Sequence, residues 1–364
     1  MLSTNSWRAR SPKSMLTLLD SYIRALPIIS QNDVSLNSEI DCYTYEIRKS
    51  YSTSGYPNLG KGFSHDEALV SGLMEAFEMC FIEKVASLDW YDHSLFSSLQ
   101  NYDPHALITL NPLIGSGGEA QMDSIFVHSS DQKQLCKNKS LTNGLASGQS
   151  FDDCCIHAIY ELIERHMLGS ETRTKLSLLG LDSSIQYFID KLSQHHIQCT
   201  LYFRGCFANT VTIEAHLLYD RSLSLSKSLG GLGFGCSGSL TIAVSRAISE
   251  AYQSLSLAQA IEKQDHGLGT HLTSEEYGYF PELNNHPDSS YQLALMIKEA
   301  PQHQSIYLDD LPYAFNSVHQ LDSLLSDLST DGVDDLSYLK FTNDDLPFMV
   351  MRCFSPCLHN SYNI

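Results

Sequence analysis

Hydrophobic residues recur along the chain at two spacings, and each spacing predicts a different element. Apolar residues three and four positions apart predict helices, whereas short apolar or alternating runs predict strands. The helical spacing is found at 13–26, 65–86, 151–168, 183–197, 240–262, 288–299 and 317–328. The strand pattern is found at 42–48, 125–127, 199–204, 211–219, 223–229 and 348–354. Helices and strands mixed in this order favour an α/β or mixed α+β fold.

Segments rich in glycine, proline or serine separate these elements. The expected loops lie at 50–62, 100–124 and 230–238. No low-complexity linker divides the chain, so we predict a single domain over residues 1–364. It would begin with a helical segment at about 8–40 and end with a less regular part at about 263–364.

Three of the predicted helices carry a glutamate at the same place in a shared pattern. A small residue comes first, then a branched apolar residue, then one further residue and the glutamate. These glutamates are Glu75, Glu161 and Glu250, which lie 86 and 89 residues apart. Two of the helices add a second glutamate three residues later, at Glu78 and Glu164, and the third has Gln253 there.

Residues at i and i+3 share one face of a helix, so each segment directs two oxygen-bearing side chains the same way. Such oxygens are the ligands that hard cations such as Mg²⁺ prefer. These helices are apolar nearly all round, so we expect the carboxylates to be buried. Buried carboxylates are costly without a metal or an arginine partner. The pattern therefore favours a metal site over a solvated helix face.

Each of these helices follows a short segment rich in glycine or serine. The segments are Gly60-Lys61-Gly62, 143–148 and 230–238. The expected N-caps are Ser64 with Glu67, Ser150 with Asp153, and Ser239 or Ser237. Glycine lets backbone amides approach an anion, and a helix N-terminus adds favourable partial charge there. Carboxylates for a metal together with amide-rich loops predict a magnesium–nucleotide site.

Two other nucleotide-binding motifs fit the sequence less well. The residues from Gly233 to Gly238 match G-x-G-x-x-G, which is typical of dinucleotide-dependent oxidoreductases. That site needs a second strand ending in an acidic residue about twenty positions later, but the helical pattern continues there. A Walker P-loop is excluded because Gly62, rather than Ser or Thr, follows Lys61.

Composition excludes several classes of protein. The 364 residues carry a formal net charge of −19 and include no run of Lys or Arg, which argues against a nucleic-acid surface. No stretch reaches 18 uninterrupted apolar residues, so no membrane span is expected, and the N-terminus does not resemble a signal peptide. Ten cysteines without a C-x-x-C pair do not suggest a disulfide framework. We expect a cytoplasmic protein.

Taken together, the motifs resemble those of the YcaO family. They are Gly60-Lys61-Gly62, Ser71-x-x-x-Glu75-x-x-Glu78, Thr142-Asn143-Gly144-x-Ala146-x-Gly148, Glu161-x-x-Glu164-Arg165, and a glycine-rich segment before Arg246-x-x-x-Glu250-x-x-Gln253. The resemblance implies a YcaO-type fold with an ATP site lined by glutamates that bind magnesium. Family members use ATP to activate a backbone amide of a ribosomally made peptide. Their products are azolines, thioamides or amidines.

The resemblance also implies roles for individual residues. Magnesium would be bound by Glu75, Glu78, Glu161 and Glu164. Nucleotide contacts would come from Lys61, Ser71, Asn143, Arg165, Arg246, Gln253 and, near the N-terminus, Lys13 or Arg10. Catalytic roles fall to Arg165, Glu250 and Gln253.

Some positions depart from the family pattern. Met79 and Leu255 stand where basic residues are frequent, and residues 360–364 lack the proline-rich end of azoline-forming members. This leaves thioamidation or another backbone change open, and makes a catalytically lapsed nucleotide- or peptide-binding subunit the alternative hypothesis. The chain has no evident peptide-recognition module. We therefore expect a companion protein that binds the precursor's leader or supplies sulfur, and a homodimer.

Overall fold

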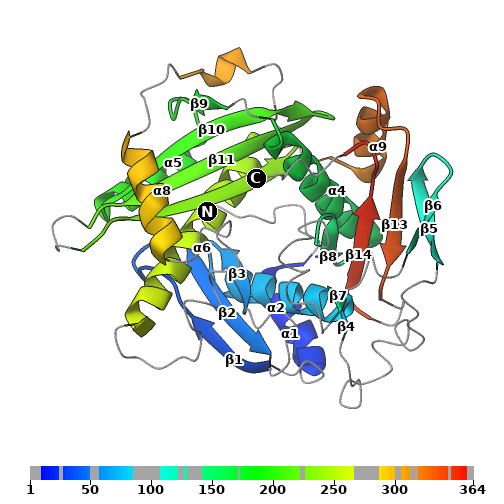
Figure 1. Ribbon diagram of the computed structural model, residues 1–364, viewed down its shortest axis with the longest axis horizontal. Helices are drawn as coiled ribbons and strands as arrows, with labels where there is room; N and C mark the ends of the chain where they lie inside the picture. Colours follow the sequence, from blue (N-terminus) through cyan, green and yellow to red (C-terminus); the bar gives the residue numbers. More distant parts are fainter. Residues whose placement is uncertain are drawn as a thin grey trace.

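The computed structural model combines helices with three main sheets (Figure 1). It describes residues 10–23, 28–49, 57–84, 107–121, 127–128, 142–170, 173–221, 226–265, 287–299, 305–311, 315, 319–342 and 346–358. The strands of the three main sheets pair antiparallel, so the mixed fold predicted from the sequence is of the α+β kind. Within the described residues, no helix has the length and apolar character needed to cross a membrane.

The first sheet has three strands in the order β1-β2-β3 and packs against two helices. Its strands are β1 (Ile28–Asp33), β2 (Tyr43–Lys49) and β3 (Asn58–Gly62). The helices are α1 (Pro12–Ile23) and α2 (His65–Ile82), and α2 leads into the short parallel pair β4 (Glu83–Lys84) and β7 (Val127–His128). Apolar side chains of α1, α2 and β2 form one hydrophobic core with Phe341, Phe348 and Val350.

The second sheet has five strands in the order β6-β5-β13-β14-β8. They are β5 (Leu107–Ile114), β6 (Gly118–Gln121), β8 (Leu145–Gly148), β13 (Leu336–Lys340) and β14 (Met349–Phe354). Two helices pack here, α4 (Phe151–Leu168) and α9 (Leu321–Thr330). A second core lies between α4, α9 and the inner strands.

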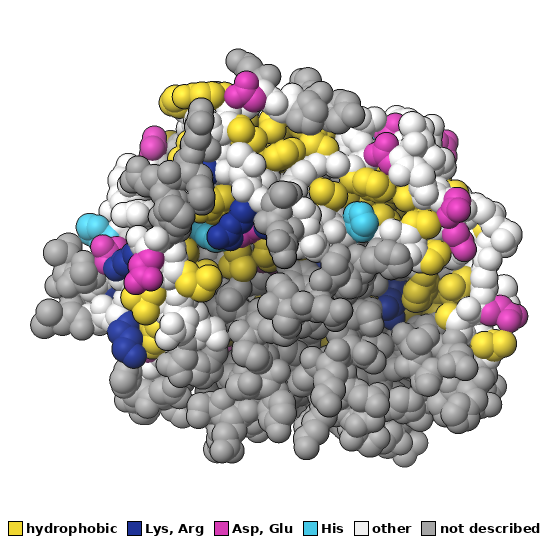
Figure 2. Space-filling view, turned by 45° about the horizontal axis from the view of Figure 1, so that its top comes forward, with side chains coloured by type: hydrophobic (Ala, Val, Ile, Leu, Met, Phe, Trp, Pro, Cys, Tyr) yellow, Lys and Arg dark blue, Asp and Glu magenta, His cyan; other side chains and the backbone are white. Residues whose placement is uncertain are grey.

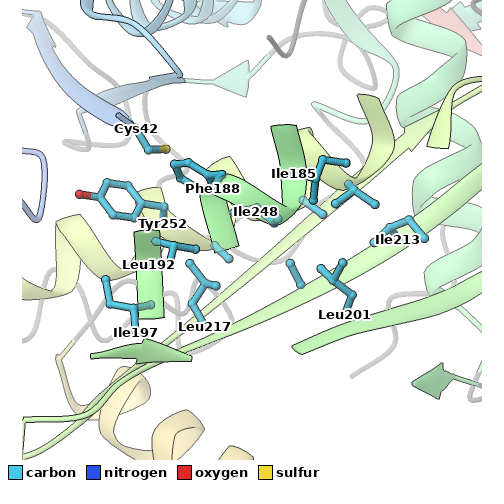
Figure 3. Packing of buried hydrophobic residues seen from close by; sticks show 14 of the residues in the cluster. Cys42, Ile185, Phe188, Leu192, Ile197, Leu201, Ile213, Leu217, Ile248 and Tyr252 are labelled. Carbon is cyan, nitrogen blue, oxygen red and sulfur yellow. The ribbon is translucent and has the colours of Figure 1, made fainter. Parts of the chain in front are cut away.

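The third sheet has four strands in the order β12-β11-β10-β9. They are β9 (Thr174–Leu176), β10 (Ile197–Phe207), β11 (Thr210–Tyr219) and β12 (Leu229–Ser237). The helices around it are α5 (Ser183–Gln194), α6 (Leu240–Asp265) and α8 (Pro287–Glu299), with a 3-10 turn at Leu308–Asp310. Figure 3 shows its core, in which Phe188 and Leu192 of α5 and Tyr252 of α6 lie over Leu201 and Leu217 of the sheet.

One strand–helix unit occurs three times, once in each sheet. The pairs are β3 with α2, β8 with α4, and β12 with α6. In each pair two residues separate the end of the strand from the start of the helix. The Ser64 and Ser150 hydroxyls accept hydrogen bonds from the amides of Glu67 and Asp153, both at 3.2 Å, which confirms these two predicted caps.

Glycines allow each of these strands to lie directly on the backbone of its helix. A Cβ atom on Gly231, Gly233 or Gly235 would come within 2.2 Å of a backbone atom of Ala251 or Ala243 in α6. Gly60 is similarly close to the Ala68 carbonyl oxygen in α2. In two of the three segments the shared small residue lies at such a contact, Gly72 beside Gly60 and Ala247 beside Gly233.

Several sequence predictions need correction. The glycine-rich segment 230–238, expected as a loop, forms most of strand β12, because its glycines are needed for contact with α6. Strands also occupy residues 58–62 and 107–121 within two other expected loops, and β13 was not predicted. The helix predicted to reach 197 ends at Gln194, since Ile197 begins β10, and the helix predicted to reach 86 ends at Ile82. The strand predicted at 223–229 lies outside the described residues at 223–225, and residues 226–228 are not in a strand, since β12 begins only at Leu229.

The other predicted helices lie where the periodicity indicated. The bounds of α4 agree with the prediction at both ends.

Exposed large hydrophobic side chains are found at Leu107, Leu179, Tyr187, Leu295, Met296 and Tyr307. On the face shown in Figure 2, hydrophobic side chains lie between polar and charged ones.

Candidate functional site

The three helices that carry the shared pattern of glutamates lie around the middle of the molecule (Figure 1). Lys61 of β3 forms an ion pair with Glu250 of α6, with 2.5 Å between Nζ and Oε2. The charges of both residues also act on Glu164 of α4. The first, second and third strand–helix units therefore each supply a charged side chain to one region.

Each helix presents three polar residues on the face that carries its glutamate. The positions are a glutamate, the residue four before it and the residue three after it, which share one helix face. The rows are Ser71-Glu75-Glu78 on α2, His157-Glu161-Glu164 on α4 and Arg246-Glu250-Gln253 on α6. Glu164 is buried, with 6% of its surface exposed, and the other eight are partly buried.

Glu75 is held by the strand that precedes its helix. Its carboxylate accepts hydrogen bonds from the Leu59 backbone N–H and the Asn58 side chain, and Lys61 and Lys49 lie close enough to act on it. Burial nevertheless raises the pKa of Glu75 from 4.5 to about 7, because these partners only partly offset desolvation. The Oδ1 atom of Asn58 is buried without a hydrogen-bond partner among the described residues.

The two glutamates of α4 are also raised in pKa by burial. Burial raises the pKa of Glu161 to about 7, with Glu164 adding to the rise and Arg165, Arg246 and Arg352 opposing it. Burial also raises the pKa of Glu164, and the negative charge of Glu250 acts in the same direction. Arg165 lies 3.8 Å from Glu161. Burial and mutual repulsion therefore disfavour the ionised form of both acids.

Hard cations fit this set of oxygen donors. Four glutamates lie on the site-facing sides of α2 and α4, and the raised pKa values of Glu75, Glu161 and Glu164 mark carboxylates that lack sufficient positive charge around them. Among the described side chains, no three His, Cys, Asp or Glu residues are gathered closely enough to hold a metal on their own. Magnesium commonly takes only one or two protein carboxylates and completes its shell with phosphate and water oxygens. The donors here suit that manner of binding.

Cations line the same region. Arg246 of α6 lies with its Nη2 atom 3.1 Å from Nε2 of His157 in α4. Arg352 of β14 is buried, and its Nε donates to the Asn143 carbonyl oxygen at 3.1 Å. Burial lowers the pKa of Arg352 to about 10, although Glu161 opposes the change. The Oδ1 atom of Asn143 is buried with no described hydrogen-bond partner. These donors and cations suit a polyphosphate.

The structure brings most of the residues singled out by sequence into this region. Glu75, Glu161, Glu164, Glu250, Lys61, Arg165 and Arg246 are joined by the ion pairs and charge interactions above. Ser71, Glu78 and Gln253 lie on the same helix faces. Lys13 differs, because it lies on the exposed side of α1, where its ammonium makes no hydrogen bond or ion pair with the described residues.

Four residues of the region were not singled out by sequence. Lys49, Asn58, His157 and Arg352 all act on the glutamates or on their cation partners. His157 could have been found, since it occupies the position of Ser71 and Arg246 in the shared pattern. Arg352 could also have been found from the sequence, because an arginine within an apolar strand is rarely buried without a partner.

Comparison with known proteins identifies the family to which the sequence is similar. The family described as YcaO cyclodehydratase, ATP- and Mg²⁺-binding, matches residues 120–359, which include α4 and α6 but not α2. An uncharacterised protein of Mycobacterium tuberculosis is 26% identical over 290 residues, which cover 71% of this chain and 63% of that protein. An uncharacterised protein of Methanothermobacter thermautotrophicus is 23% identical over 309 residues, covering 78% of this chain and 77% of that protein. The chain therefore spans less than two thirds of the mycobacterial relative.

Solved structures share the fold at low sequence identity. The YcaO protein of Methanopyrus kandleri bound with AMPPCP and Mg²⁺ superposes with a TM-score of 0.66 at 18% identity, covering 99% of this chain and 96% of the other. A heterocyclase in complex with substrate and cofactor gives 0.64 at 14% identity, covering 99% and 54%. The Escherichia coli microcin synthetase McbBCD complex with pro-MccB17 bound gives 0.56 at 14% identity, covering 91% and 88%.

Proposed function

Because the chain belongs to the YcaO family, which is described as ATP- and Mg²⁺-binding, we propose that it activates backbone amides of a ribosomally made peptide or protein with ATP and magnesium. The observation that carries this proposal is the group of half-buried and buried glutamates with raised pKa values, placed beside Arg165, Arg246 and Lys61. Carboxylates in that state gain from a divalent cation, and the cations beside them gain from an anion. A magnesium–nucleotide complex supplies both.

The residues divide into two sets by the chemistry of their side chains. Glu75, Glu78, Glu161 and Glu164 would hold magnesium, and Ser71, Asn143, Arg165 and Arg246 would hold the phosphates. Bound ATP would supply the phosphoryl group that turns the amide oxygen into a leaving group. Arg165 and Arg246 would then face the negative charge of the phosphates, and their planar guanidinium groups suit that geometry.

Glu250 has a separate role in this proposal. Its carboxylate is paired with Lys61 at 2.5 Å, so part of its charge is offset. We assign Glu250 to holding Lys61 across the gap between β3 and α6 rather than to binding metal. Gln253, one turn further along α6, would contribute a neutral amide on the same face. The catalytic roles given to Arg165, Glu250 and Gln253 stay proposals.

The lapsed-subunit alternative loses its main support. It was motivated by Met79 and Leu255, which stand where the family often has basic residues. Leu255 is fully buried in the core beneath β12, and Met79 packs against the core of the first sheet. Both side chains therefore take part in hydrophobic packing, which gives each exchange a structural reason other than loss of activity.

The same proposal extends to the class of substrate and product. Similar proteins include a heterocyclase in complex with substrate and a microcin synthetase complex that contains pro-MccB17. We propose a precursor peptide as substrate, a companion protein that binds its leader or supplies sulfur, and a homodimer. Expulsion of the activated oxygen by a nucleophile gives a loss of about 18 Da per site for an azoline or amidine, and a gain of about 16 Da for a thioamide.

Calorimetry with AMPPCP and MgCl₂ tests the nucleotide site without knowledge of the substrate. The wild-type chain should bind the pair, and the Glu161→Gln, Glu164→Gln double variant should lose binding while its melting curve stays cooperative. Glu119→Gln serves as the control, because Glu119 is exposed on β6. A wild-type chain that does not bind, or a double variant that binds as well as the control, would refute the proposed function.

A further inference from the structure

His157 occupies one of nine equivalent positions around the candidate site, yet nothing so far gives it a role. It lies on α4 one helical turn before Glu161, where α2 has Ser71 and α6 has Arg246. Because residues at i, i+4 and i+7 share a helix face, His157 faces the same way as Glu161 and Glu164. Its side chain is only partly buried, so it is not an ordinary member of the hydrophobic core.

The imidazole of His157 contacts the arginine at the equivalent position of another helix. The Nη2 atom of Arg246 lies 3.1 Å from His157 Nε2. A guanidinium has donors and no acceptor, so Nε2 must be the accepting nitrogen. In this arrangement the imidazole is neutral and carries its hydrogen on Nδ1. The hydrogen bond spans from α6 to α4 and joins two strand–helix units.

The charge of its hydrogen-bond partner affects how strongly an arginine can bind an anion. A carboxylate partner would fix the guanidinium but would also offset its charge, as Glu250 does for Lys61 at 2.5 Å. A neutral imidazole fixes the guanidinium and adds no negative charge. Arg246 is close enough to Glu161 and Glu164 to lower the pKa of both. Once magnesium balances those carboxylates, the positive charge of Arg246 would attract phosphate more strongly.

We propose that His157 is a positioning residue that holds the Arg246 guanidinium toward α4, aimed at the nucleotide phosphates. This inference rests on the proposed function. An arginine side chain has several rotatable bonds, and fixing it in advance lowers the entropy lost when the anion binds. His157 would therefore contribute to nucleotide affinity through Arg246, without itself touching a phosphate.

A double-mutant cycle separates this role from a purely structural one. The measured quantity is the dissociation constant for AMPPCP with MgCl₂, determined by calorimetry for the wild type, His157→Ala, Arg246→Ala and the double variant. His157→Ala should weaken binding about tenfold, which is the size expected for a hydrogen bond to a charged group. In the Arg246→Ala background the same change should have less than about a twofold effect, because the group it acts through is gone.

Two further variants sharpen the outcome. His157→Gln keeps an acceptor oxygen for Arg246 and should recover most of the affinity. His166→Ala is the matched control on the same helix, where the imidazole packs beside the Phe207 ring at 5.5 Å, and it should bind nucleotide like the wild type. Equal effects of His157→Ala in both Arg246 backgrounds, or no recovery with Gln, would overturn the inference. A wild-type chain that binds no nucleotide would instead refute the proposed function.

Discussion

Replacing Glu161 by Gln should stabilise the ligand-free protein at alkaline pH. Burial raises the pKa of Glu161 from 4.5 to about 7, and its side chain is 21% exposed. At 1.36 kcal/mol for each pKa unit, the ionised form costs the folded state about 3 kcal/mol. Glutamine has the same shape and no charge, so the variant avoids this cost.

The sign of the pH dependence follows from proton binding. Below the unfolded pKa of 4.5 the carboxyl group is protonated in both states and contributes nothing. Between 4.5 and about 7 the unfolded chain ionises while the folded one keeps its proton, so the free energy of unfolding falls as pH rises. Above about 7 the full cost is present. The advantage of the variant should therefore grow across this window and then level off.

Urea unfolding in the presence of EDTA measures the effect. The free energy of unfolding of Glu161→Gln minus that of the wild type should be near zero at about pH 4.5 and should reach about 2–3 kcal/mol at about pH 8.5. Taking the difference removes other titrating groups, such as His319, whose pKa burial lowers. Glu119→Gln is again the control and should show no such trend. A difference that is flat with pH, or that falls as pH rises, would refute the reasoning.

Two further predictions concern the packing that positions the site. Gly233→Ala should lower the free energy of unfolding by about 3 kcal/mol, because its Cβ would lie 2.2 Å from the Ala251 nitrogen. The control Gly118→Ala, whose Cβ would have nothing within 4 Å, should lower it by less than about 1 kcal/mol, and equal urea midpoints for the two variants would contradict the prediction. Tyr160→Phe should cost about 1–2 kcal/mol in the same assay, because the buried hydroxyl accepts from the Gly238 N–H at 3.2 Å and lies 3.0 Å from His319 Nδ1. An unchanged stability would mean that water replaces the hydroxyl.

The helices of the candidate site could be predicted from sequence because their signals are local. The bounds of α4 follow from its apolar periodicity and from Ser150, which caps it as expected. The shared glutamate pattern also predicted which residues share a helix face, since positions three and four residues apart on a helix are fixed by its geometry. Local rules were sufficient wherever the helix itself decides the outcome.

The glycine-rich strand β12 could not be predicted in the same way. Glycine is unfavourable in strands by its own propensity, so the run around Gly233 indicated a loop. The deciding factor is the close approach of α6, whose Ala243, Ala247 and Ala251 leave no room for side chains on the strand. That contact joins segments already assigned to a loop and a helix, and it is visible only once both are placed in space. The same holds for Arg352, whose partners Asn143 and Glu161 are distant in sequence.

We expect the molecule to open most easily between the three strand–helix units. Each glutamate-bearing helix packs on the strand just before it, so a unit keeps its internal contacts when it moves as a body. Polar side-chain bridges, Lys61–Glu250 and Arg246–His157, cross between units beside acids that repel one another. A ligand that balances the negative charge of those acids would hold the units together. Amide hydrogen exchange should then slow most at the ends of β3, β8 and β12 that face the site, and least along the strands remote from it.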